Sequence, residues 1–380
     1  MAKKKGESTS TTLEAHSRAK VELFKEYLAI YLNIMQRAVG IDHLMFFDIC
    51  AGEGVYADGG KGSPVMIMET IKDHYFANEK QCLRIHVELN DPGLSKVEKG
   101  RKKIERVEEA VTKLFRPSNV QVSFSARGYT DILGDVQRKV DALGPKERAI
   151  VFIDPWGYKE IKPLDLVQLM KNGRTEVLLF LPTSDMHRFA RKALSDDEFP
   201  GGVPLREFLL TLYAGDSPDT STALEFAGSL LQRFKLLPDI KYVDKFTLER
   251  GTGRYFCLYF FTSHRLGLRK MVEAKWRIDE KEGRGFVLPK VQVDLFTGHQ
   301  HSGYPEVLKE GLKKSGGMTN EQLELFGLVE GYLPKHTADL FKLWKEEGIL
   351  EVVSLDGLPV KGYYLNDMKR QVMIKLKHHG

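Results

Sequence analysis

The chain has 380 residues, of which 42% are hydrophobic and 29% charged, and its formal net charge is +5. The length predicts two domains, the composition is ordinary for a soluble globular protein, and the mild positive charge is compatible with an anionic partner without indicating one. Every apolar run falls short of the roughly 18 residues that a membrane-spanning helix requires, which excludes a membrane protein of that kind.

The N-terminal residues and the three cysteines bear on where the protein works. Residues 1–12, MAKKKGESTSTT, are basic and then polar. They lack the apolar segment of a secretory signal, and we expect a disordered tail. Cys50, Cys82 and Cys257 form no CxxC pair, so we expect neither a disulfide framework nor a metal site. Reduced thiols of this kind predict a cytoplasmic protein.

Strands and helices alternate through the first half of the chain. Strands are predicted at residues 44–50, 83–89, 119–126, 148–154 and 175–181. Helices are predicted at residues 13–38, from Ser63, from Asp91, at 131–143 and at 163–172. This alternation predicts a Rossmann-like α/β fold, in which helices cover both faces of a parallel sheet.

The pattern changes after the fifth strand. Residues 184–240 are predicted to be a largely helical insertion, and residues 241–250 and 254–263 flank Gly251-Thr252-Gly253 as in an antiparallel hairpin. A parallel core closed by such a hairpin is the outline of a class I methyltransferase sheet, which we assign to residues 13–295. Residues 303–380 read as three helices and a small hairpin around Asp356-Gly357, and they predict a winged-helix domain.

A glycine cluster follows the first predicted strand directly, in FFDICAGEG. No GK[ST] follows, which excludes a Walker loop, and the spacing is not the GxGxxG of a dinucleotide site. The stretch fits the D/E-x-x-x-G-x-G pattern of S-adenosylmethionine (SAM) enzymes, whose backbone passes beside the amino acid and ribose of the cofactor. We therefore predict SAM as the cofactor, bound by Asp48, Ala51, Gly52 and Gly54.

The second predicted strand supplies an acidic side chain near its end. Glu88 is predicted to accept hydrogen bonds from both ribose hydroxyls, as the acidic residue does in other Rossmann-like sites. Asn90 and Asp91 are neighbours that could take this role instead.

The fourth predicted strand ends in a motif that indicates the chemistry. Asp154-Pro155-Trp156 is similar to the D-P-P-Y motif of amino-methyltransferases, although Gly157 replaces its final aromatic residue. Asp154 and the Pro155 carbonyl would accept hydrogen bonds from a target amine and localise its lone pair. Trp156 or Tyr158 would stack on a flipped base.

Two basic segments are the predicted contacts to nucleic acid. Lys102 and Lys103 lie in the first, residues 96–106, and Arg269 lies in the second, residues 265–277. Such charge runs are also typical of a solvated helix face.

Residues 301–380 contain eleven Lys and Arg and eleven Asp and Glu, so the predicted winged helix has no excess of positive charge with which to bind a DNA groove. We favour methylation of an amine nitrogen of a nucleic-acid base, with a protein or small-molecule acceptor as the alternative.

Four motifs together resemble the three-Cys-motif partner family over nearly the whole chain: HSRAK, FFDICAGEG followed by GSP, IVFIDPWG and FFTSHRLGLRKM. The resemblance implies a class I SAM-dependent methyltransferase-like fold with a C-terminal winged helix. In prokaryotes it also implies a neighbouring partner with a three-cysteine, radical-SAM-like motif. It places Ser63 at a helix start beside the cofactor. It places His16 and Lys20 on one helical face, toward the methionine carboxylate or an anionic substrate. A non-catalytic SAM-fold partner is a further alternative.

Overall fold

A computed structural model describes residues 11–78, 83–155, 157–196, 199–249, 254–279, 283, 285–286, 303–367 and 369–377. These residues form two compact units. The first runs to Gly267 and includes Gly285 and Phe286, and the second comprises Leu268–Asp279, Gly283 and the described residues from Gly303.

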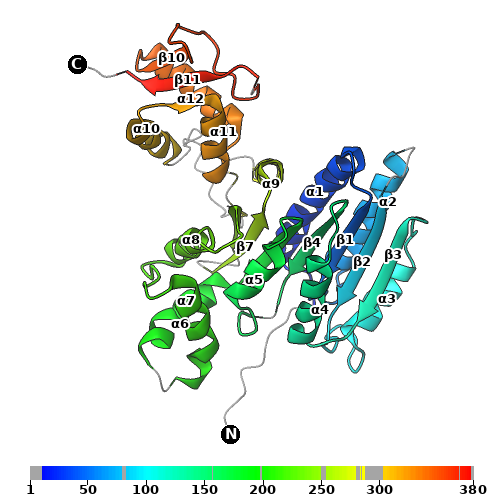
Figure 1. The fold of residues 1–380 in the computed structure, drawn as a ribbon. Coiled ribbons are helices and arrows are strands. Elements are labelled where there is room, and N and C mark those ends of the chain that lie inside the picture. Colours follow the sequence, from blue (N-terminus) through cyan, green and yellow to red (C-terminus); the bar gives the residue numbers. More distant parts are fainter. Residues whose placement is uncertain are drawn as a thin grey trace. The chain divides into compact units, whose positions relative to one another are not determined.

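An eight-stranded sheet of order β3-β2-β1-β4-β5-β7-β6-β8 is the centre of the first unit (Figure 1). The strands are β1 His43–Asp48, β2 Arg84–Asn90, β3 Val120–Ser125, β4 Glu147–Ile153, β5 Thr175–Leu181, β6 Tyr242–Glu249, β7 Tyr255–Thr262 and β8 Gly285–Phe286. Strands β1 to β5 pair in parallel, while β7 is antiparallel to β5 and β6. The predicted parallel core closed by an antiparallel hairpin is confirmed, and the sheet is that of a Rossmann-like methyltransferase fold.

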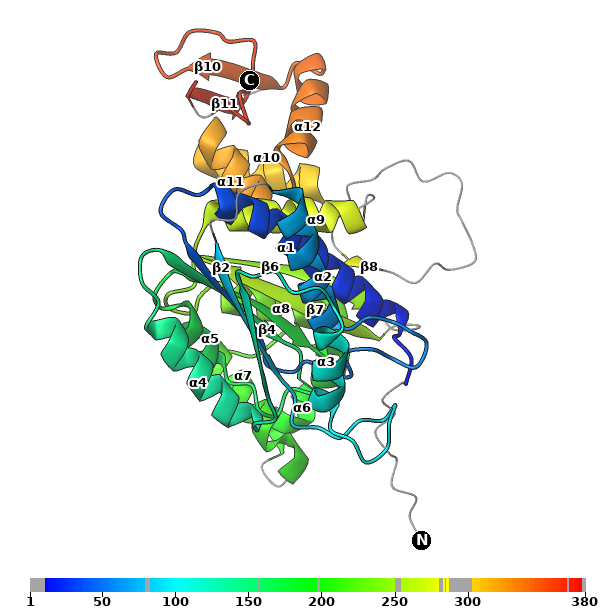
Figure 2. The same ribbon diagram turned by 90° about the vertical axis from the view of Figure 1, so that its right-hand side faces the viewer.

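Helices cover both faces of this sheet because successive residues of each buried strand point to opposite sides. Helix α1 Ala15–Arg37 precedes β1, and the helices between the parallel strands are α2 Ser63–Ala77, α3 Lys103–Thr112, α4 Tyr129–Asp141 and α5 Pro163–Met170. Phe24 of α1 stacks on Phe152 of β4 at 4.7 Å between ring centroids. The next residue, Ile153, belongs to the core cluster that includes residues of α4 and α5. These two helices cover the face of the sheet opposite α1 (Figure 2).

A helical segment separates β5 from β6, in the region predicted as an insertion. It contains α6 Thr183–Ser195, a 3₁₀ turn at Pro200–Gly202, α7 Val203–Tyr213 and α8 Ala223–Phe234. Phe208, Phe226 and Phe234 are buried and extend the core beyond the sheet.

The charged helix predicted from Asp91 begins only at Lys103. The loop before it is held by Glu53, whose carboxylate accepts hydrogen bonds from Ser95 Oγ and from the Lys96 backbone N–H, both at 2.8 Å. A backbone N–H committed to a distant carboxylate is withdrawn from helical bonding, so a tertiary contact overrides the local helical pattern.

The second unit contains most of α9 Arg265–Ile278, then α10 Tyr304–Ser315, β9 Met318–Thr319, α11 Asn320–Val329, α12 Pro334–Glu346, β10 Leu350–Ser354 and β11 Val372–Leu376. The last three strands form a sheet of order β10-β11-β9. The strand predicted directly after Asp356-Gly357 is reduced to an isolated antiparallel bridge between Val353 and Pro359, and β10 pairs along its whole length with β11. Buried Asn320 fixes that path: its amide donates to the carbonyls of Tyr364 and Arg370 and accepts from the Val372 N–H.

Candidate functional site

The loop after β1 brings its backbone to the carboxyl edge of the parallel strands. Gly52 and Gly54 have φ angles of +69° and +71°, a left-handed conformation that favours glycine. The Ala51 N–H donates to the Asn90 carbonyl and the Gly52 N–H to Asp91 Oδ2, each at 2.9 Å. This edge is where parallel α/β sheets bind their ligands. The predicted loop residues and the segment after β2 therefore lie together.

Glu53, between the two glycines, anchors the loop, and the sequence reasoning did not identify it. Its carboxylate is buried and accepts a hydrogen bond from Arg106 Nη1 at 2.6 Å, in addition to those from Ser95 and Lys96. Arg106 also donates to the Val55 carbonyl at 3.0 Å. The sequence did contain a signal for Glu53, since it is a charged residue within a loop of otherwise small residues.

Asp48, the last residue of β1, is fully buried. Ser63 Oγ at the start of α2 donates to its Oδ2 at 2.6 Å, while its Oδ1 is buried without a hydrogen-bond partner among the described residues. Burial raises the pKa of Asp48 to about 7, the bond from Ser63 opposes that rise, and the nearby Asp154 carboxylate adds to it. A buried carboxylate with a free oxygen suits a charged N–H donor.

Tyr56 is a second residue of this region that the sequence reasoning missed. Burial, followed by the field of Asp154, raises the pKa of its phenol. The hydroxyl therefore stays neutral and is available as a donor near these carboxylates.

Glu88 lies on the other face of the sheet. It pairs in register with Phe47, whereas Asp48 pairs with Leu89, so Glu88 points toward α4 and Asp48 toward α2. Its two oxygens accept hydrogen bonds from Arg127 Nη2 at 3.2 Å and Lys139 Nζ at 2.6 Å. This arrangement gives no support to the predicted ribose contact, because both oxygens are engaged by cations of the same chain.

Asp91, one of the two alternatives to Glu88, lies beside the glycine loop. It accepts the Gly52 N–H and, at 2.8 Å, the Gly93 N–H. Lys103 is almost completely buried, and its Nζ lies 3.6 Å from Asp91 Oδ1. This burial argues against the predicted contact of Lys103 with substrate phosphate, because its ammonium group lies inside the fold. The neighbouring Lys102 is exposed.

Asp154 follows β4 at the same edge, and its carboxylate forms an ion pair with Lys20 of α1. Lys20 is 6% exposed, and its Nζ lies 4.3 Å from the centroid of the Phe180 ring. The family resemblance implied that Lys20 faces the cofactor, and the structure places its ammonium group on the predicted catalytic carboxylate.

An aromatic stack continues from this ion pair. Phe180 at the end of β5 stacks on Phe256 of β7 at 5.2 Å, and Phe256 stacks on His16 at 5.0 Å. His16 and Lys20 therefore share one face of α1, as their spacing predicts, and both face the sheet edge. The two phenylalanines were not predicted because nothing local relates β5 to β7.

The remaining predicted residues are distributed as follows. Pro155 is half-buried beside Asp154, and Trp156 lies outside the described residues. Tyr158 is half-buried against the hydrophobic core, and burial raises the pKa of its phenol. Arg269 belongs to the second unit, where it donates to Glu324 Oε1 and Asn366 Oδ1, each at 3.0 Å. These bonds argue against the predicted phosphate contact of Arg269, because its guanidinium is already engaged.

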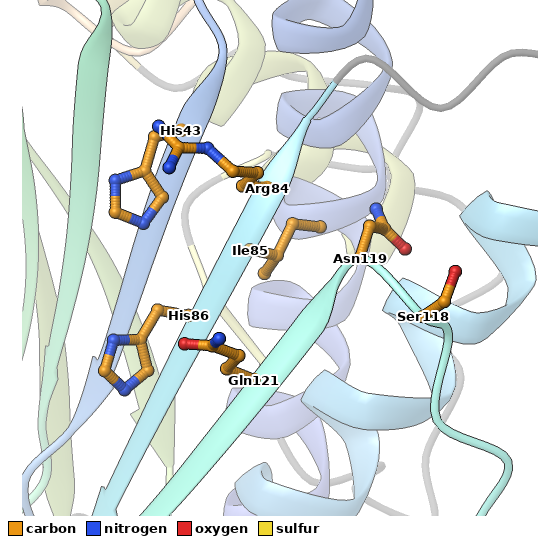
Figure 3. Close-up of a pocket in the computed structure, with 7 residues that line it drawn as sticks. All are labelled: His43, Arg84, Ile85, His86, Ser118, Asn119 and Gln121. Atoms are coloured by element: carbon orange, nitrogen blue, oxygen red, sulfur yellow. The ribbon is translucent and has the colours of Figure 1, made fainter.

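A pocket of about 280 Å³ lies at the opposite edge of the sheet (Figure 3). It is lined by the first residues of β1, β2 and β3 and the loop before β3: His43, Arg84, Ile85, His86, Ser118, Asn119 and Gln121. The length of the strands, roughly 20 Å, separates it from the glycine loop. It is therefore not part of the candidate site.

Among the described residues, no group of three His, Cys, Asp or Glu side chains could hold a metal ion, and no helix is long and apolar enough to cross a membrane.

The sheet order and the loop at its carboxyl edge define a Rossmann-like class I methyltransferase fold. No protein-family model matches the chain, and no curated protein matches it. Three solved structures illustrate what it is similar to. One is "Loganic acid methyltransferase with SAH", at 10% identity over 99% of both chains, with a TM-score of 0.29.

The second is a "putative rRNA-methylase" from Clostridium thermocellum, at 10% identity over 62% of this chain and 96% of the other, with a TM-score of 0.26. The third is MNMC2 from Aquifex aeolicus, at 11% identity over 63% of this chain and 61% of the other, with a TM-score of 0.27. At such scores the fold assignment rests on the sheet order of the chain itself.

Proposed function

We propose that the first unit is a SAM-dependent methyltransferase whose acceptor is an amine nitrogen. The observation that carries the proposal is the buried Asp48 beside the glycine loop, with one oxygen that has no partner among the described residues. The methionine part of SAM carries an ammonium group, which would supply the missing donor. The loop backbone at Gly52 and Gly54 would approach the rest of the cofactor without a side chain in the way.

Bound SAM supplies an electrophilic methyl group on a sulfonium, and Asp154 prepares the nucleophile. Its carboxylate would accept a hydrogen bond from the amine and direct the nitrogen lone pair at the methyl carbon. Positive charge develops on the nitrogen during transfer, and a fixed carboxylate stabilises it. The face of Phe180 would add cation–π stabilisation and exclude water. Rate would come mainly from position and desolvation.

The favoured acceptor is an exocyclic amine of a nucleic-acid base, on the strength of the motif after β4. A protein or small-molecule amine is the second candidate. The contacts of Lys103 and Arg269 favour this second candidate, since both cations are engaged within the chain. A non-catalytic role as partner of a three-Cys-motif protein is the third, and it rests on the family resemblance alone.

For the second unit we propose a winged-helix module. The order helix, strand, helix, helix, strand, strand from α10 to β11 supports it. Its neutral charge balance favours protein contacts over a DNA groove.

Two measurements test the proposed function. Calorimetry with SAM should show binding, and incubation with methyl-labelled SAM should transfer label to one of four fractions: RNA, DNA, protein or small molecules. Asp154→Asn should keep SAM binding and lose transfer by roughly 10²–10³-fold. Asp42→Asn, a partly exposed carboxylate before β1, is the matched control and should change neither SAM binding nor methyl transfer. Absence of SAM binding at millimolar concentration would refute the proposal.

A further inference from the structure

The ion pair between Lys20 and Asp154 places an amine of the protein itself at the proposed acceptor position. Lys20 lies in the N-terminal half of α1 and reaches the residue that follows β4, 134 positions away in the sequence. Its side chain is 8% exposed and that of Asp154 is 23% exposed, so the pair is largely shielded from water. Burying a long, charged side chain is costly unless its ammonium is satisfied, and here the carboxylate satisfies it.

The surroundings of Lys20 Nζ are those expected for a substrate amine. A carboxylate oxygen accepts its N–H, and the Phe180 ring lies 4.3 Å away beneath the ammonium. Phe180 is held in place by the parallel stack with Phe256 and His16. An aromatic face together with a carboxylate is also the combination that binds methylated ammonium groups. The same site would therefore accommodate Lys20 before and after a methyl group is added.

We infer that Lys20 is a self-methylation site, occupying the acceptor position when no substrate is bound. The inference rests on the proposed function. In the reaction Lys20 Nζ gives up a proton through Asp154 to solvent, and its lone pair forms a bond to the methyl carbon. The bond from that carbon to the sulfonium sulfur breaks, with its electron pair remaining on sulfur. The products are methyl-lysine, still cationic, and S-adenosylhomocysteine.

Self-methylation would have a consequence for substrates. Lys20 keeps its charge when methylated but has one N–H fewer to donate. Asp154 would then be held less tightly, and an incoming amine would displace the side chain of Lys20 more readily. The methylation state of Lys20 on α1 would in this way control how readily a substrate amine enters the acceptor position.

The test uses the full chain and SAM alone. After incubation with methyl-labelled SAM, peptide mass spectrometry should find one methyl group on Lys20 and none on Lys25, an exposed lysine of the same helix. Lys20→Arg keeps a cation beside Asp154 and should gain no label. Asp154→Asn should bind SAM normally and label Lys20 roughly 10²-fold more slowly. The wild-type rate should not depend on protein concentration, as expected for transfer within one molecule.

SAM binding without a methyl group on Lys20 would overturn the inference and leave the proposed function in place. Label that persists in Lys20→Arg, or that spreads over exposed lysines, would overturn it as well. Absence of SAM binding by calorimetry would overturn both, so the two failures are distinguishable.

Discussion

At the scale of single residues, the site is governed by how four carboxylates are held. Asp48 has an oxygen without a partner among the described residues, Glu53 fixes the loop, Glu88 faces away, and Asp154 holds Lys20. All four lie within six positions of the end of a strand, yet their surroundings differ completely. The function of each follows from its partners and burial rather than from its residue type.

Asp48 should make cofactor binding depend on pH. Because the pKa of Asp48 is raised to about 7, the carboxylate that would bind the ammonium group of SAM is fully formed only above that pH. Affinity for SAM should therefore rise as the pH passes upward through 7. Asp48→Asn should weaken binding roughly 10- to 100-fold, the value of a hydrogen bond to a charged group, and remove this rise. Calorimetry across the pH range checks both; an unchanged pH dependence in the variant would contradict the assignment.

Variants of Glu88 and Asp91 should distinguish a carboxylate that stabilises the fold from one that supports SAM binding. Glu88→Gln breaks its bonds to Arg127 and Lys139 and should lower the free energy of unfolding by ~1–3 kcal/mol, with SAM affinity nearly unchanged. Asp91→Asn should lower SAM affinity because it releases the Gly52 N–H. Urea denaturation and calorimetry on both variants distinguish these roles. If Glu88→Gln lowered SAM affinity and Asp91→Asn did not, Glu88 would again be the candidate for binding the ribose hydroxyls.

At the scale of elements, the loop after β1 is shaped by its contact with α3. The glycine cluster and the helix start at Ser63 followed from the sequence, because they are local signals. The delayed start of α3 did not, because it depends on Glu53, some forty residues earlier in the chain. In the same way β11 could not be assigned locally, since Asn320 directs the chain past residues 364–372.

Gly54 should tolerate substitution less well than Gly59. Both have positive φ angles, +71° and +78°, so alanine costs ~1–2 kcal/mol at either position. A Cβ on Gly54 would also lie 3.1 Å from Val107 Cγ2, whereas one on Gly59 meets nothing within 4 Å. Gly54→Ala should therefore lower both stability and SAM affinity more than Gly59→Ala, as measured by urea denaturation and calorimetry. Equal effects would show that contact with α3 does not shape the loop.

Glu176, at the start of β5, should make stability fall as the pH rises. Tyr27 of α1 and Thr262 of β7 donate to its buried carboxylate, yet burial raises its pKa from 4.5 to about 7. The folded chain therefore holds a proton that the unfolded chain releases. The contribution of Glu176 is fully present below pH 4.5 and is lost as the pH approaches 7, a change of about 3 kcal/mol.

Glu176→Gln should flatten this decline in thermal unfolding measured between those pH values. Glu22→Gln, at a partly exposed position on α1, should retain the wild-type profile. Asp48 titrates in the same range, so part of the decline should remain in Glu176→Gln. If the stability of Glu176→Gln fell with pH as steeply as that of the wild type, Glu176 would be excluded as a source of the decline.

At the scale of the whole molecule, the division into two units falls inside α9 rather than after it. Trp276 of α9 is buried, donates from Nε1 to the Gly331 carbonyl at 2.9 Å, and lies 3.9 Å from the His336 ring. The sequence predicted a second domain from residue 303, because helix and strand patterns restart there. A helix that belongs by sequence to the first domain therefore completes the core of the second.

Two C-terminal fragments test this division. A fragment that begins at Leu268 should unfold cooperatively, whereas one that begins at Gly303 lacks Trp276 and should lose ~3–5 kcal/mol, the cost of removing a buried aromatic residue. Thermal unfolding followed by circular dichroism measures both. Equal stability would place the boundary after α9 instead.

The sequence by itself determined the alternating strands and helices, the hairpin that closes the sheet, and which segments end in Asp48, Asp154 and the glycine loop. These follow from periodicity and local turn chemistry, which act over a few residues. Only the tertiary structure decided which side chains meet. Whether Glu88 faces the site depends on the pairing of β2 with β1. The contacts of Lys20 with Asp154 and of Glu53 with Arg106 join residues far apart in the chain, and such pairs are set by packing and burial rather than by any local pattern.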